Sequence, residues 1–272
     1  MSQPLFRLTQ LAIGVAALSF GTSAFASPVN VTVTIENLAA ANSVSFAPLR
    51  VGFNNGSFDS FNLGQTAGAP IVSIAEGGGG GAWFPAFAAA DPTATLGTVL
   101  GPGAPPLQPG QTSNASFTVD SAINQYFTFA AMVIPSNDYF IGNDDPMQYR
   151  LFDVNGNLNL NSINLKASDI WESGSELFNP LNAAFLQIGT NALRDPENGV
   201  VTRDFEELSG FDGLVTATGY TFKSALTANT DIYKITFGVS AVPVPAALPL
   251  MASALGVFGL AKRRRQNKLA AT

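Results

Sequence analysis

Short runs of the chain alternate between apolar and polar side chains, which indicates β-strands. The clearest run, residues 29–35, has an apolar side chain at every second position, as a strand with one buried face does. Weaker runs of the same kind cover residues 44–46, 49–53, 113–119 and 231–239. No segment carries three turns of an amphipathic helix. The pattern therefore predicts an all-β fold, an antiparallel β-sandwich.

Residues 126–134 differ from the other predicted strands because they are apolar almost throughout. A strand of this composition is typically covered on both faces, so we expect it at the centre of a sheet. The side chains of Phe127, Phe129, Met132 and Ile134 should then belong to the hydrophobic core.

Asparagine and glycine mark the expected turns. Asn54-Asn55-Gly56 predicts a hairpin in which residues 57–61 return beside residues 49–53. Asn155-Gly156 predicts a second hairpin, between residues 149–153 and 158–160.

Residues 64–110 are rich in glycine and proline, which predicts a long irregular insertion. We expect short helices within it, around residues 71–76 and near residues 83–90. The glycine run at 77–81 is not a phosphate-binding loop, because the Lys-Ser/Thr pair of a P-loop is absent.

Residues 1–26 have the three parts of a secretory signal peptide. Arg7 supplies the charged region, residues 11–20 are apolar, and Ala24-Phe25-Ala26 is an A-x-A cleavage site. A buried first helix is the alternative, but such a helix would not need the cleavage site. We therefore expect an exported domain over residues 27–240. Since the chain has no cysteine, this domain has to be stable without disulfides.

The C-terminal segment, residues 241–272, has the pattern of a membrane-inserted tail. Val242-Pro243-Val244-Pro245 opens an apolar stretch that ends at Ala261, and four basic residues (262–265) follow it. Roughly 16 apolar or small residues are near the lower limit for a spanning helix, and the basic cluster is a positive-inside stop signal. The segment resembles a PEP-CTERM sorting signal, although the usual glutamate between the prolines is absent.

That resemblance implies a transient membrane insertion and cleavage by an exosortase-type sorting protease of Gram-negative bacteria. The domain would then be exported across the inner membrane and would lie outside the cell or on the outer surface. A permanent C-terminal membrane anchor is the alternative, and it stays open.

Composition excludes many classes of enzyme. The 272 residues include no histidine and no cysteine, which excludes a Ser-His-Asp triad, thiol catalysis and zinc sites built on these ligands. All 19 acidic residues lie between residues 27 and 241, whereas six of the 13 basic residues lie outside this range, so the exported domain has a formal charge of 7 − 19 = −12. This charge repels nucleic acid, and it repels anionic membranes unless cations intervene.

Acidic and amide side chains gather just after the apolar strand. Residues 135–146 contain Asp138, Asp144 and Asp145 with two asparagines and no basic residue, and Glu172 and Glu176 follow further along. Carboxylates that lie close together repel one another unless a cation neutralises them, and calcium prefers such oxygen ligands. A solvated acidic loop is the alternative.

Residues 153–157 begin like an EF-hand loop. Their glycine is at the fourth position, however, and Asn164 stands in place of the twelfth-position glutamate. We therefore interpret Asp153 and its neighbours as a turn.

Three segments resemble the spondin N-terminal domain: residues 45–59, residues 129–142 and residues 171–176. The similarity extends over roughly residues 29–240, and the block from Met132 to Gly142 is its most specific part. The resemblance implies a β-sandwich similar to a C2 domain, in the class of secreted matrix and adhesion proteins. It also implies one bound calcium ion, held by an aspartate of the Pro-Ser-x-Asp block and by two acidic residues four positions apart.

Carried to this sequence, the implied calcium ligands are Asp138, Glu172 and Glu176. Asn137 and Asp144 are further candidates. Glu172 and Glu176 stand where animal members have aspartate, and the cysteines that those members carry between the two ligand segments are absent here. The two loops can meet only if the chain between Asp138 and Glu172 folds back at the Asn155-Gly156 turn.

Three functions remain open from the sequence. The favoured one is a non-enzymatic calcium-binding module that contacts extracellular matrix or exopolysaccharide components in surface adhesion. The second is a glycan hydrolase with Glu172 and Glu176 as paired carboxylates, which would have to lie about 5–10 Å apart. The third is C2-like binding of lipid through the calcium loop.

Overall fold

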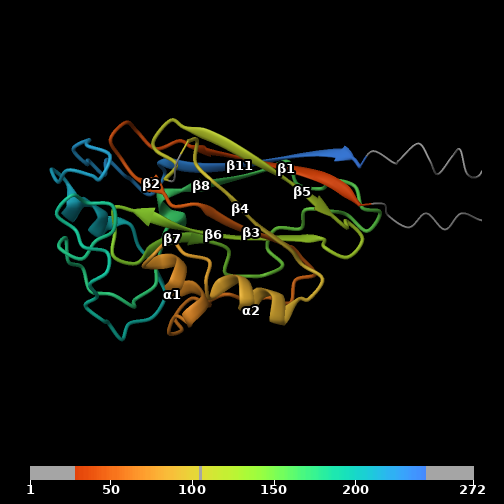
Figure 1. Cartoon of the computed structure of the whole chain (residues 1–272), viewed down its shortest axis with the longest axis horizontal. Helices are drawn as coiled ribbons and strands as arrows, with labels where there is room; N and C mark the ends of the chain where they lie inside the picture. The colour runs from red at the N-terminus through yellow and green to blue at the C-terminus, as the bar shows by residue number, and fades with distance from the viewer. Residues whose placement is uncertain (1–27, 104–105, 243–272) are drawn as a thin grey trace, which may run out of the picture.

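The computed structural model describes residues 28–103 and 106–242, which form two antiparallel β-sheets packed face to face (Figure 1). The predicted all-β sandwich is therefore confirmed. The smaller sheet has four strands, in the spatial order β5 (Thr112–Val119), β1 (Val29–Asn37), β11 (Asp231–Ala241) and β8 (Ser162–Lys166).

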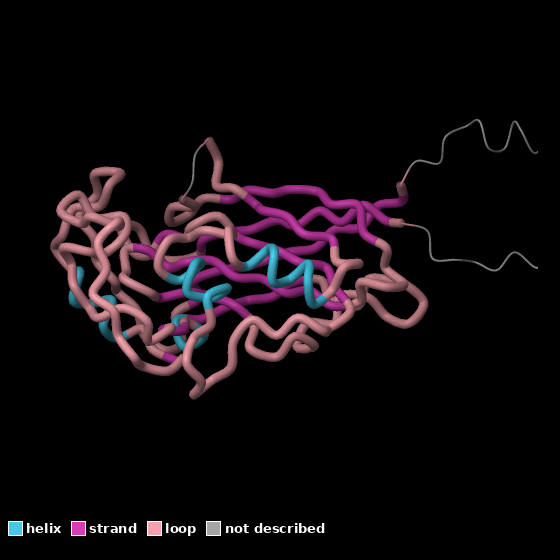
Figure 2. Tube along the Cα trace, turned by 60° about the horizontal axis from the view of Figure 1, so that its bottom comes forward, coloured by secondary structure: helices cyan, strands magenta, loops and turns pink. Residues whose placement is uncertain are grey.

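The larger sheet continues in the order β10 (Thr202–Arg203), β9 (Trp171–Glu172), β7 (Tyr139–Gly142), β6 (Tyr126–Ile134), β3 (Leu49–Asn54) and β4 (Thr95–Val99). A seventh strand, β2 (Ser45–Phe46), pairs with β6 outside this path. Two helices, α1 (Ala69–Ala75) and α2 (Trp83–Ala90), cover the outer face of this sheet (Figure 2). Two 3-10 helices, η1 (Ala167–Asp169) and η2 (Glu206–Phe211), lie in the later loops.

The core lies where the predicted apolar faces meet. In β1, Val31, Val33 and Ile35 are buried, and the polar residues between them face outward. In β6, Phe127 and Phe129 point into the sandwich, whereas Ala130 packs in the cluster under the helices. Both faces of β6 are therefore covered, which explains why its sequence does not alternate.

The first predicted hairpin is wrong. Residues 57–61 do not form a strand, and β3 instead pairs with β6 and with β4, which lies inside the predicted irregular insertion. Phe58 and Phe61 pack against Trp83 and Trp171 instead, with ring centroids 5.6 and 5.1 Å apart. Burial of these two rings between helix and sheet outweighs the local turn signal.

The missed strand, β4, has a weak sequence pattern for a packing reason. Gly97 at its centre lies against the ring of Phe117 in the opposite sheet, and a Cβ at this position would overlap that ring. A glycine interrupts the alternation by which strands are found. The short helices predicted in the same insertion are present as α1 and α2. The second predicted hairpin is reduced to a single bridge between Phe152 and Leu158.

The two ends of the described chain leave the sandwich together. Val29 at the start of β1 pairs with Ala241 at the end of β11, and long loops of the second half of the chain form the opposite end of the molecule (Figure 1). Among the described residues, no helix is long and apolar enough to cross a membrane. The predicted signal peptide (1–26) and almost all of the predicted tail (241–272) lie outside the described residues.

Removing the ring of Phe129 tests the central strand. Phe129 is fully buried in β6, so Phe129→Ala should lower the free energy of unfolding by about 3–5 kcal/mol through the cavity that it leaves. Urea denaturation of residues 27–242 measures this loss. Thr112→Ala, on the exposed outer face of β5, should change stability by less than about 0.5 kcal/mol. A loss below about 1 kcal/mol for Phe129→Ala would contradict the central-strand assignment.

Candidate functional site

Asp138 lies in the tight turn between β6 and β7, and its side chain is buried. The hydroxyl of Ser136 braces this turn: it donates to the carbonyl of Val133 (2.5 Å) and accepts from the N–H of Tyr139 (3.2 Å). This local geometry points the carboxylate of Asp138 toward the segment that follows β9.

The carboxylate of Asp138 joins its turn to residues 173–176. Its Oδ2 accepts hydrogen bonds from Ser173 Oγ (2.9 Å), Ser175 N (2.8 Å) and Glu176 N (3.2 Å). Gly174 makes the sharp bend between these donors, with φ of +64°, and a Cβ here would lie 2.7 Å from backbone atoms of Val200. The two predicted ligand loops therefore meet at Asp138.

Glu172 ends β9 beside Tyr139 of β7, with which it is paired in register. Its Oε2 accepts a hydrogen bond from Thr202 Oγ1 (3.1 Å). Burial, followed by the nearby charge of Asp138, raises the pKa of Glu172 to about 7. Glu172 is therefore a carboxyl group that a nearby cation would strongly favour in its charged form.

Glu176 is buried like Asp138, and its side chain has no exposed surface. Its Oε1 accepts a long hydrogen bond from Asn137 Nδ2 (3.4 Å). Its Oε2 has no hydrogen-bond partner and lies 3.5 Å from Arg194 Nε. Burial raises the pKa of Glu176 to about 7, and the charge of Arg194 opposes this rise.

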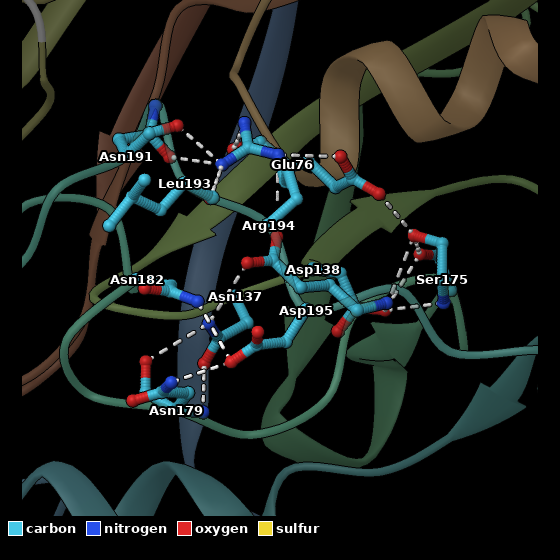
Figure 3. A network of polar contacts seen from close by, with 12 residues as sticks. Glu76, Asn137, Asp138, Ser175, Asn179, Asn182, Asn191, Leu193, Arg194 and Asp195 are labelled. Atoms are coloured by element: carbon cyan, nitrogen blue, oxygen red, sulfur yellow. Dashed lines mark hydrogen bonds and ion pairs between the residues drawn. The ribbon is translucent and has the colours of Figure 1, made fainter.

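Sequence reasoning missed the groups on the other side of this cluster, Arg194 and Glu76. Arg194 Nε donates to Glu76 Oε2 (2.8 Å), and Ser175 Oγ donates to Glu76 Oε1 (2.8 Å), as Figure 3 shows. Arg194 and Glu76 are 118 residues apart in the chain, so no local signal could have joined them. A guanidinium therefore neutralises part of the acidic cluster.

The two further candidates differ in their placement. Asn137 belongs to the cluster: besides Glu176, its side chain bonds the backbone of Asn179 through both Nδ2 and Oδ1. The carboxylate of Asp144 instead accepts from Leu63 N (3.3 Å), and no hydrogen bond of the described residues joins it to the three main candidates. Asp153 accepts from the N–H groups of Asn155 and Asn157, as expected for a turn.

A second acidic group adjoins Glu172. Tyr139 Oη donates to Asp204 Oδ2 (2.8 Å) and lies 3.5 Å from Glu207 Oε2, and both carboxylates contribute to the raised pKa of Glu172. The run of acidic residues at 204–207 was the available sequence signal for this group. It lies in the loop and 3-10 helix after β10, and no pattern in the sequence placed it beside β7.

The donors suit calcium chemically, because they are carboxylate and hydroxyl oxygens and one of them, Glu176 Oε2, is buried without a hydrogen bond. The positions of these donors, however, do not form a complete metal site. Within residues 28–103 and 106–242, no group of three or more acidic side chains is placed so that it could hold a metal ion. Around Glu176 it is the guanidinium of Arg194 that takes the position of the counter-cation.

Comparison with known proteins adds no family assignment. No protein-family profile matches the chain, and no curated protein is significantly similar to it. The resemblance to the spondin N-terminal domain and to a PEP-CTERM signal therefore stays a prediction from the sequence.

The raised pKa values predict how stability depends on pH. In the folded protein Glu172 and Glu176 bind protons more tightly than at their ordinary pKa of 4.5. Their contribution is therefore fully present below pH 4.5 and is lost as the pH rises through about 7. Without divalent cations, the free energy of unfolding should fall by about 1–3 kcal/mol between pH 5 and pH 8.

Urea denaturation in a chelating buffer measures this slope. Glu172→Gln combined with Glu176→Gln should flatten it, because neither amide titrates. Asp153→Asn serves as the control, since hydrogen bonds from Asn157 and Asn155 lower the pKa of Asp153, and the fall between pH 5 and pH 8 should remain. Equal stability of the unsubstituted protein at both pH values would contradict this prediction.

Proposed function

We propose that this chain is an exported, non-enzymatic β-sandwich module that binds calcium and makes contacts in extracellular matrix or on the cell surface. The observation that carries the proposal is Glu176 Oε2, which is buried without a hydrogen bond near the buried carboxylate of Asp138 and, among the described residues, has only the guanidinium of Arg194, 3.5 Å away, as a counter-charge. Buried carboxylates are costly unless a cation compensates them. Asp138 lies between the paired strands β6 and β7, and Glu172 ends β9, which pairs with β7, so hydrogen-bonded strands position both carboxylates.

Asp138, Glu172 and Glu176 would hold the ion, with Asn137 as a neighbouring oxygen donor. A bound calcium ion would supply positive charge to carboxylates whose pKa burial raises. In the chain itself, the three donors to Asp138 Oδ2 orient that carboxylate, and Arg194 competes with an ion for Glu176.

Calcium should raise the melting temperature of residues 27–242, because a ligand of the folded state stabilises it by mass action. At a calcium concentration 100 times the dissociation constant, the gain should be about 2.7 kcal/mol. Thermal denaturation with and without calcium measures it. Asp138→Asn should remove most of the gain, whereas Asp153→Asn should leave it intact.

A direct binding measurement tests the proposal even if the Asp138→Asn variant does not fold. Terbium, a calcium substitute, should luminesce when Trp171, which precedes Glu172 in the chain, is excited, and Glu172→Gln should weaken this signal. If millimolar calcium does not change the melting temperature and terbium gives no signal, the calcium proposal is contradicted, and the acidic cluster has only a structural role.

The non-enzymatic part of the proposal is supported by the surroundings of the carboxylates. Cavities of about 340, 200 and 190 Å³ adjoin η2, and their linings include Glu206 and Glu207 but none of the three proposed ligands. A glycosidase needs its two carboxyl groups across a sugar-binding cleft. Hydrolysis in a screen of polysaccharides, lost on Glu172→Gln, would instead support the hydrolase alternative.

Contacts with matrix or exopolysaccharide components follow from the resemblance and from export. The charge of −12 on the exported domain disfavours nucleic acid as a partner. The proposed route out of the cell uses the signal peptide, insertion of the tail and an exosortase-type protease.

The tail is tested by the mass of the exported protein. If residues 242–265 are a sorting signal, the released form should end near Val242–Pro245, and intact-mass analysis of the exported protein will show this end. Retention of Thr272 would instead identify a permanent anchor.

A further inference from the structure

Large apolar side chains are exposed along residues 177–193. Five of them have between 41 and 60% of their surface accessible: Leu177, Phe178, Leu181, Ile188 and Leu193. The segment belongs to the loops at the end of the molecule opposite the two termini (Figure 1). The ring of Phe178 also packs against that of Phe211 in η2, with centroids 4.8 Å apart, so the other four side chains supply most of the free apolar surface of this segment. Exposed apolar groups gathered in one loop are typical of surfaces that contact another phase or molecule.

The segment is a closed loop with a firm base. Glu176 forms a bridge with Pro196, Leu177 N donates to the carbonyl of Asp195 (2.9 Å), and Glu197 N donates to the carbonyl of Ser175 (2.9 Å). The base therefore begins at the acidic cluster, and the apolar side chains extend from it.

Polar groups of the loop largely satisfy one another. Asp195 Oδ2 accepts from the side-chain amides of Asn179 (2.6 Å) and Asn182 (2.9 Å). Many backbone N–H groups are paired within the loop or with neighbouring loops: Asn182 and Ala183 with Asn179, Ala184 with Ser136, Gln187 with Val215, Thr190 with Leu181, and Leu193 with Thr190. Because paired backbone groups cost less to remove from water than unpaired ones, this pairing lowers the cost of placing the loop at the boundary between headgroups and acyl chains.

The composition of the loop distinguishes a lipid surface from a protein partner. Residues 177–193 contain no charged residue, although the exported domain as a whole carries −12. They also contain no tryptophan, tyrosine or arginine, the residues that most often anchor protein interfaces. Leucine, isoleucine and phenylalanine on an uncharged loop suit the boundary between headgroups and acyl chains.

We infer that residues 177–193 insert their exposed apolar side chains into a lipid surface. The end of the molecule that these loops form would then touch the lipid. Neutral lipid should be enough for binding, because residues 177–193 carry no charge. The inference does not depend on calcium, although a bound ion at the base would reduce the repulsion from anionic lipid.

A fluorescent probe on the loop tests this contact in the full chain. The natural chain has no cysteine, so Leu193→Cys can be labelled with NBD at a single position. With phosphatidylcholine vesicles in a chelating buffer, NBD fluorescence should rise, and lipids that carry a doxyl quencher should reduce it. A label at Ser116→Cys, on the exposed outer face of β5, should show neither effect.

A second substitution separates insertion of the loop from adsorption through another part of the chain. Leu181 is 60% exposed, so Leu181→Asp should leave the fold intact and weaken quenching at position 193 by about tenfold or more. Ser116→Asp is the matched control and should leave quenching unchanged.

Three results would overturn the inference. The first is the absence of quenching at position 193 both with phosphatidylcholine and with a 3:1 mixture of phosphatidylcholine and phosphatidylglycerol in millimolar calcium. The second is equal quenching at positions 193 and 116. The third is concentration-dependent self-association that Leu181→Asp abolishes while vesicles have no effect, which would identify a protein interface. Because the first arm contains chelator, failure of calcium binding leaves its expected result unchanged.

Discussion

The arrangement of the loop end depends on one buried carboxylate. Asp138 Oδ2 accepts three hydrogen bonds from the segment 173–176, and this joins the turn after the central strand to the chain that leaves β9. Without the carboxylate, Ser173 Oγ and two backbone N–H groups would lose a shared acceptor. Buried donors that lose their acceptor are costly, so the position of Glu172 and Glu176 follows from Asp138.

The carboxylates at this end of the molecule repel one another, and basic side chains offset only part of this repulsion. Arg194 bridges Glu76 and Glu176 and thereby ties the apolar loop to the C-terminal end of α1. Glu172 has hydroxyl and acidic neighbours instead, and its pKa stays raised to about 7. In the proposed function, this uncompensated negative charge is what a bound divalent cation would neutralise.

The same network positions the exposed apolar loop. Asp195 follows Arg194 and accepts hydrogen bonds from the side-chain amides of Asn179 and Asn182. These contacts hold the loop in the conformation in which Leu181 and Leu193 are exposed. The proposed calcium site and the proposed lipid contact therefore share the base of one loop. Each nevertheless rests on its own observation: a buried carboxylate oxygen without a hydrogen bond in one case, and a set of exposed apolar side chains in the other.

The amino-acid sequence by itself determined the elements whose signal is local. The alternation in residues 29–35 and the apolar run in 126–134 identified β1 and β6, because the period of side chains in a strand is two and a doubly covered strand has no polar face. The resemblance to the spondin N-terminal domain grouped Asp138, Glu172 and Glu176, and the structure joins the loop of Asp138 to the segment that contains Glu176.

Tertiary contacts decided the features whose partners are distant in the chain. Residues 57–61 follow a strong turn signal, yet Phe58 and Phe61 gain more by packing under the helices than by pairing with β3. β4 was hidden because Gly97 accommodates a ring from the other sheet. Arg194 meets Glu76 across 118 residues. Contacts of this kind depend on how two sheets and their loops pack, and a periodic pattern along the chain carries no information about that packing.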